Sequence, residues 1–136
     1  MRLNRNRALA LALLAPVVVT VSGCILGLVV GAGLGVAGMK YINGEGKASF
    51  GASLEQTRIA TNQALEDLSW TPVDKGHDAL IARIGALTAE GKDIKIEIKG
   101  ESDKVSMVSI RVGTWGDKTI TRMIFTKIEE RLKTPR

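Results

Sequence analysis

Cys24 is the only cysteine of the 136-residue chain, and it lies within a long apolar stretch. Ser22 and Gly23 precede it and are small enough to let an extended chain enter a peptidase cleft, so we expect cleavage between Gly23 and Cys24. The thiol of the new terminal residue would then be an anchoring point. A disulfide within the chain is excluded because there is no second cysteine. The alternative is an unmodified thiol buried among apolar residues, where cysteine is common.

The residues before Cys24 have the three parts of a secretory signal. A basic head, MRLNRNR, is followed by the apolar stretch ALALALLAPVVVTV and then by the small residues. We therefore assign residues 1–23 to a signal peptide. In a rival interpretation, this segment is not cleaved and forms a transmembrane helix of the inner membrane. The 32 residues from Ala8 to Met39 carry no charge, and about 20 such residues suffice to cross a bilayer. In both cases the C-terminal part faces away from the cytoplasm.

The stretch VSGC resembles the lipobox of bacterial lipoproteins, although Val21 stands where leucine is commoner. The resemblance implies a diacylglycerol on Cys24, removal of the leader and acylation of the new amino terminus. Several acyl chains on one residue agree with the physics, since a single chain binds a bilayer only marginally. Ile25, rather than aspartate, follows the cysteine, and by the same resemblance this favours a lipid-anchored protein of the outer membrane that faces the periplasm.

A glycine-rich apolar segment follows the cysteine, and we assign residues 24–44 to a tether. Gly33, Gly35 and Gly38 spell G-x-G-x-x-G, the pattern of a dinucleotide-binding turn. We reject that function because NGEG interrupts the segment that should form the phosphate-binding helix, and no βαβ unit surrounds it. Glycines also recur at every fourth residue from Gly27, a spacing that allows close helix contact in a membrane. Self-association of the tether is therefore an alternative.

His77 is the only histidine, and Asp74 and Asp78 lie beside it in VDKGHD, which we expect to be a polar loop. A transition-metal site generally needs three or four convergent ligands, so we expect no metal and no cofactor here.

The sequence offers no recognisable catalytic arrangement. No G-x-S-x-G frame accompanies any serine, and the acids of pairs such as Glu66–Asp67 point in different directions on a helix. We therefore assign no catalytic residue and predict that the chain is not an enzyme. A small periplasmic enzyme is the alternative.

The net charge of +5 comes largely from the leader. Without Arg2, Arg5 and Arg7, 16 basic residues stand against 14 acidic ones, which gives +2. The basic residues are interleaved with acids along the sequence rather than gathered into a stripe, and aromatic residues are few. Nucleic acid is thus excluded as a partner, because the electrostatic pattern that it needs is missing.

Residues 45–136 have the patterns of one small folded domain. GKASFGAS alternates apolar and polar residues, as a half-buried strand does, and Ser53 with Gln56 forms a capping box at the start of a helix that ends near Trp70. Asp117 is placed to cap a second amphipathic helix. Three strands lie between the helices, over 79–89, 93–99 and 105–112. The fold class is therefore α+β, with the order β-α-β-β-β-α and both helices on one face of an antiparallel sheet in a two-layer domain.

The lipobox, the tether, the helix ASL…T…ALEDL and the closing IRVGTWGDKTITRMIFTKI together resemble an uncharacterised family of small bacterial lipoproteins, classified as a domain of unknown function. The resemblance covers nearly all of the mature chain and implies no activity, substrate or catalytic residue. We therefore expect a membrane-anchored lipoprotein of the cell envelope whose domain is a binding or scaffolding module with an envelope protein as partner.

One face of the predicted sheet should meet water, since both helices cover the other. The alternation of the strands over 93–99 and 105–112 places a mixed-charge set of side chains there, which is a candidate partner surface or else a plain solvated face. Its members are Lys95, Glu97, Lys99, Ser109 and Arg111.

Trp115 belongs to VGTWGDKT, the connection from the last strand to the last helix. Gly113 and Gly116 allow the chain to turn there. We expect Trp115 to fill a gap under this turn, as a connection of this length needs such residues without any ligand. If the indole instead stands in solvent, it joins the candidate partner surface.

Overall fold

The computed structural model describes residues 35–134. The predictions made for the signal peptide, for cleavage at Gly23–Cys24, for lipid on Cys24 and for the tether up to residue 34 lie outside these residues. The elements of the described part are the 3₁₀ helix η1 (Val36–Gly38), the strands β1 (Lys40–Ile42), β2 (Glu45–Phe50), β3 (Val73–His77), β4 (Ile81–Leu87), β5 (Asp93–Ser102) and β6 (Val105–Val112), and the helices α3 (Leu54–Asp67) and α4 (Lys118–Lys133).

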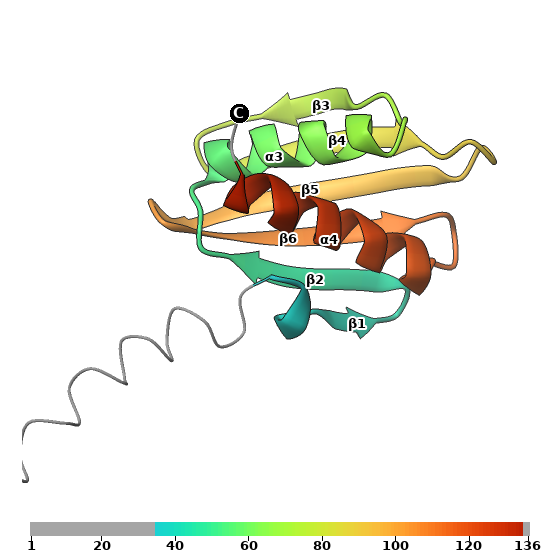
Figure 1. Cartoon of the computed structure of the whole chain (residues 1–136), viewed down its shortest axis with the longest axis horizontal. Helices are drawn as coiled ribbons and strands as arrows, with labels where there is room; N and C mark the ends of the chain where they lie inside the picture. Colours follow the sequence, from blue (N-terminus) through green and yellow to red (C-terminus); the bar gives the residue numbers. More distant parts are fainter. Residues whose placement is uncertain (1–34, 135–136) are drawn as a thin grey trace, which may run out of the picture. The chain divides into compact units, whose positions relative to one another are not determined.

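The strands form one antiparallel sheet in the order β1-β2-β6-β5-β4-β3, and α3 and α4 lie side by side across one of its faces (Figure 1). The predicted α+β class with two helices on one face of an antiparallel sheet is confirmed. The four predicted strands correspond to β2, β4, β5 and β6, which are adjacent in the sheet. Neither helix within residues 35–134 has the length and apolar character needed to cross a membrane.

Two short edge strands extend the sheet beyond the predicted four. β1 comes from residues assigned to the tether by sequence, and Gly35, Val36 and Met39 before it also contact the folded part. β3 takes the place of the expected polar loop around His77. All five of its residues are exposed, so it lacks the alternation of apolar and polar residues that marks a half-buried strand.

The core lies between the sheet and the two helices. Ile94, Ile96 and Ile98 of β5 lie opposite apolar residues of β6, as the predicted alternation requires. Phe125 of α4 packs near Phe50 of β2, with 6.1 Å between the ring centres. The fully buried apolar side chains of this core include Ala64, Leu65, Ile94, Ile98, Val108, Ile110, Val112, Ile124, Phe125 and Ile128.

Both helices begin as predicted. At α3, Ser53 Oγ accepts a hydrogen bond from the Gln56 amide at 3.2 Å, and Gln56 Oε1 accepts one from the Ser53 amide at 3.1 Å. At α4, Asp117 Oδ1 accepts from the Ile120 amide at 3.0 Å. This bond, together with the ammonium of Lys92 at 3.0 Å from Oδ2, lowers the pKa of Asp117 below its usual value. These capping bonds thus fix the residue at which each helix begins.

Helix α3 ends at Asp67, three residues before the predicted end near Trp70. Ser69 adopts a left-handed conformation (φ 61°), and the amide of Trp70 donates to the Leu65 carbonyl at 2.9 Å. The helix is therefore ended by this left-handed cap before Pro72 is reached. The chain then enters β3 at the edge of the sheet.

Candidate functional site: the open face of the sheet

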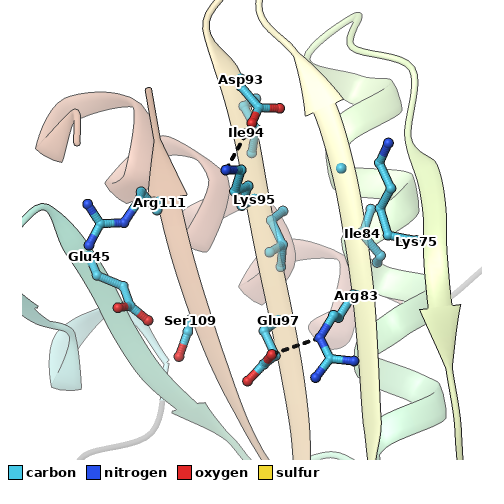
Figure 2. Close-up of a pocket in the computed structure, with 12 residues that line it drawn as sticks. Glu45, Lys75, Arg83, Ile84, Asp93, Ile94, Lys95, Glu97, Ser109 and Arg111 are labelled. Atoms are coloured by element: carbon cyan, nitrogen blue, oxygen red, sulfur yellow. Dashed lines mark hydrogen bonds and ion pairs between the residues drawn. The ribbon is translucent and has the colours of Figure 1, made fainter. Parts of the chain in front are cut away.

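The open face is the side of the sheet opposite α3 and α4, and its side chains are arranged in two cross-strand rows. Strand pairing aligns Glu45, Arg111, Lys95 and Gly85 in the first row. The second row consists of Lys47, Ser109, Glu97 and Arg83. The register therefore brings together charged residues that lie far apart in the sequence, as Figure 2 shows for most of them.

A hollow of about 500 Å³ lies on this face. Five strands contribute to its lining, and Lys75 of β3 bounds one side of it (Figure 2). A Cβ atom on Gly85 would lie 2.7 Å from Lys75 Cε, so the lysine stem passes over β4 where no side chain stands. The charged residues that line the hollow are Glu45, Lys75, Arg83, Asp93, Lys95, Glu97 and Arg111.

The structure places the predicted surface residues as follows. Lys95, Glu97, Ser109 and Arg111 all line the hollow. Lys99 is exposed on the same face, one row further along β5 and opposite Met107, but does not line the hollow.

Four other charged residues of the hollow were not predicted. Glu45, Arg83 and Asp93 lie in strands that were recognised, and the alternation of those strands could have identified them as open-face residues. Lys75 lies in β3, whose sequence gave no strand signal.

Each acid of the open face has a basic neighbour. Arg83 Nε donates to Glu97 Oε2 at 3.0 Å, while Lys47 lies 3.7 Å from Glu45 and Lys95 lies 3.6 Å from Asp93. These pairs are exposed, so each contributes at most about 1 kcal/mol to stability. Their effect is to neutralise the acids locally.

Arg111 has a different set of contacts. Its guanidinium donates to the carbonyl oxygen of Asn43 at 3.1 Å and to that of Thr114 at 3.4 Å. Arg111 thereby links the β1–β2 turn to the connection between β6 and α4. Its acceptors are neutral carbonyls, and no carboxylate of residues 35–134 forms an ion pair with it, so its positive charge is not neutralised within this part of the chain.

The expectation that Trp115 fills a gap under its turn is wrong, since its side chain is 90% exposed. The backbone itself closes the space, because a Cβ on Gly44 would lie 2.4 Å from the Trp115 carbonyl oxygen. There is no room beneath the turn for an indole. Trp115 stands in solvent next to the residues that Arg111 holds, outside the hollow.

His77 lies on the helix side of the sheet edge, because it pairs with Ala82, whose side chain is buried in the core. His77 Nδ1 is 3.0 Å from Asp74 Oδ2. A hydrogen bond from the Gly76 amide, followed by the contact with His77, lowers the pKa of Asp74. In residues 35–134, no three histidine, cysteine or acidic side chains are grouped so that they could hold a metal ion. The pair is an exposed contact within β3, and it does not line the hollow.

Comparison with known proteins adds one finding. No match to a curated protein is found. A family model described as a protein of unknown function, DUF3568, matches residues 7–131, which include both the apolar N-terminal stretch and nearly all of the described domain. The chain therefore belongs to the DUF3568 family, whose function is unknown.

Proposed function

We propose that this chain is a bacterial lipoprotein, anchored through Cys24 in the outer membrane, whose folded domain is a binding module on the periplasmic side. Two features support the anchor. The stretch VSGC follows a basic head and an apolar stretch, and the family match spans the apolar stretch and VSGC together with most of the domain. The apolar N-terminal stretch thus belongs to the region that defines the family.

The observation that carries the binding role is the uncovered face of the six-stranded sheet. Its hollow is lined by charged side chains that project from five paired strands, which form a rigid support. Ser109 lies between Lys47 and Glu97 in its row. Lys47 lies 3.7 Å from Glu45, and Arg83 engages the carboxylate of Glu97, so neither of these two neighbours is a free base beside the hydroxyl. Charged groups without a nucleophile and base in contact are suited to binding rather than catalysis.

Replacing Cys24 with serine should block lipid attachment and leader cleavage, because no other thiol can accept the lipid. We expect the precursor to accumulate at the mass of the full chain, whereas the parent gains acyl chains and loses residues 1–23. Val21→Leu, which introduces the commoner lipobox residue, is the matched control and should be processed like the parent. Intact-mass spectrometry of the membrane fraction decides. A parent protein that retains Met1 and an unmodified thiol would establish the transmembrane alternative instead.

The binding role predicts that the open face, and not the helix side, touches another envelope component. A photo-crosslinking amino acid placed at Lys99, exposed on β5, should form adducts in intact cells. The same amino acid at Arg122, exposed on α4, serves as the control and should form few or none. Mass spectrometry of the purified chain measures the adducts. Equal yields at the two positions, or none at either, would contradict a binding role for this face.

A further inference from the structure

Positive charge is concentrated on the open face. This face carries seven basic residues, Lys40, Lys47, Lys75, Arg83, Lys95, Lys99 and Arg111, and three acidic ones, Glu45, Asp93 and Glu97. The other residues of the described range contain eight basic and eleven acidic residues. The sheet face is therefore net positive, while the remainder of residues 35–134 is net negative.

Four of the seven positive charges have no carboxylate within 4.0 Å among residues 35–134. The acids Glu45, Asp93 and Glu97 pair with three other basic residues. The four that are left belong to four different strands, so they are spread across the whole face instead of converging on one point. They are Lys40, Lys75, Lys99 and Arg111. A distributed set of this kind matches a surface that bears many anions better than it matches one small anion.

Exposed aliphatic side chains lie on the same face. Ile42 of β1 is 64% exposed, Leu87 of β4 is 60% exposed and Val73 of β3 is 47% exposed. Their strand partners Glu45, Asp93 and Gly85 establish that they belong to this side of the sheet. Basic and aliphatic side chains together are the composition of protein surfaces that lie at the lipid headgroups, where cations meet phosphate and apolar groups meet the acyl boundary.

The proposed lipid anchor on Cys24 would hold the domain close to a bilayer. The uncharged run ends at Met39, and the next residue, Lys40, begins β1. Ten residues separate Cys24 from Gly35, the first described residue, and even fully extended they reach no more than about 35 Å. A domain held so near the membrane meets its lipids at a high effective concentration, so weak docking suffices.

We propose that the open face docks on the headgroups of an anionic phospholipid membrane, with Lys40, Lys75, Lys99 and Arg111 as its main contacts. This inference rests on the proposed membrane anchoring of the chain. Each basic residue near an anionic bilayer raises the affinity about fivefold, so the four together favour docking by several hundredfold over a neutral bilayer.

Lysine footprinting of the full chain tests this proposal. The membrane form is reconstituted in vesicles of phosphatidylcholine alone, or with about one third phosphatidylglycerol, and treated with a water-soluble amine reagent. We expect Lys40, Lys75 and Lys99 to react several-fold more slowly in the anionic vesicles, and high salt should abolish the difference. Lys118, exposed on α4, is the internal control and should react equally in both.

A pair of double variants separates the effect of the face from that of net charge. Lys75→Gln with Lys99→Gln should weaken docking about 25-fold and so remove most of the protection of Lys40. Lys118→Gln with Arg122→Gln removes the same charge from α4 and should leave that protection intact. Equal reactivity of the open-face lysines in the two kinds of vesicle would overturn the proposal. Protection seen only in whole envelopes would also overturn it, in favour of an acidic protein partner, and the binding role would then stand.

Discussion

Replacing Phe125 with alanine lowers the free energy of unfolding of the domain by about 3–5 kcal/mol. The Phe125 side chain is fully buried at the junction of α4 and β2. Its ring faces that of Phe50, and its edge fills the space over Gly46, where a Cβ would lie 3.0 Å from Phe125 Cε2. No larger neighbour can move into the vacated volume without disturbing the helix contact, so we expect a cavity to remain.

Urea denaturation of the chain lacking residues 1–24 measures this effect. Met123→Ala on the same helix is the matched control, because Met123 is 40% exposed and should cost about 1 kcal/mol or less. A loss at Phe125→Ala no larger than that at Met123→Ala would show that α4 does not pack on the sheet as described.

Gly116→Ala should destabilise the domain by at least about 3 kcal/mol, since two costs combine at this position. Gly116 has φ 83°, where any residue with a Cβ is strained by about 1–2 kcal/mol. A Cβ would also lie 2.2 Å from the carbonyl oxygen of Gly44. The β1–β2 turn and the connection before α4 would have to separate, and the hydrogen bonds of Arg111 to both segments would be lost with them.

Gly91→Ala carries only the first of these costs. Gly91 has φ 81°, close to that of Gly116, but no atom lies within 4 Å of the Cβ position. We therefore expect only the conformational cost of about 1–2 kcal/mol. The difference between the two variants in the same urea experiment gives the contribution of the close backbone contact. An equal loss of stability in the two variants would mean that the β1–β2 turn and the connection before α4 can move apart without cost.

Much of the fold could be predicted because burial imposes a period on the sequence. The residues of 93–99 and 105–112 alternate, and the apolar residues expected on one side of them face the core, namely Ile94, Ile96, Ile98, Val108, Ile110 and Val112. The ends of the helices are encoded just as locally, since Ser53, Gln56 and Asp117 bond to amides within three residues of themselves. Both kinds of signal depend on neighbours in the sequence, so they can be recognised without the tertiary structure.

The edge strands could not be predicted in this way. β3 is held by backbone pairing with β4, and none of its residues is buried. β1 has three residues, which are too few to show a period. Lys75 reaches the open face only because β3 is paired there. The position of Trp115 likewise depends on a contact between two backbone segments more than 60 residues apart in the sequence.

The amino-acid sequence by itself determined the two-layer α+β domain, its core and the side of the sheet on which Lys95, Glu97, Lys99 and Arg111 lie. It also indicated that basic and acidic residues are interleaved, which is true along the chain. Only the tertiary structure decided that the basic residues gather on one face. Strand pairing places Lys95 beside Arg111, while most of the acids lie in turns and on helices away from the open face. The physical reason is that side chains share a surface through the register between strands, and residues distant in sequence set that register together.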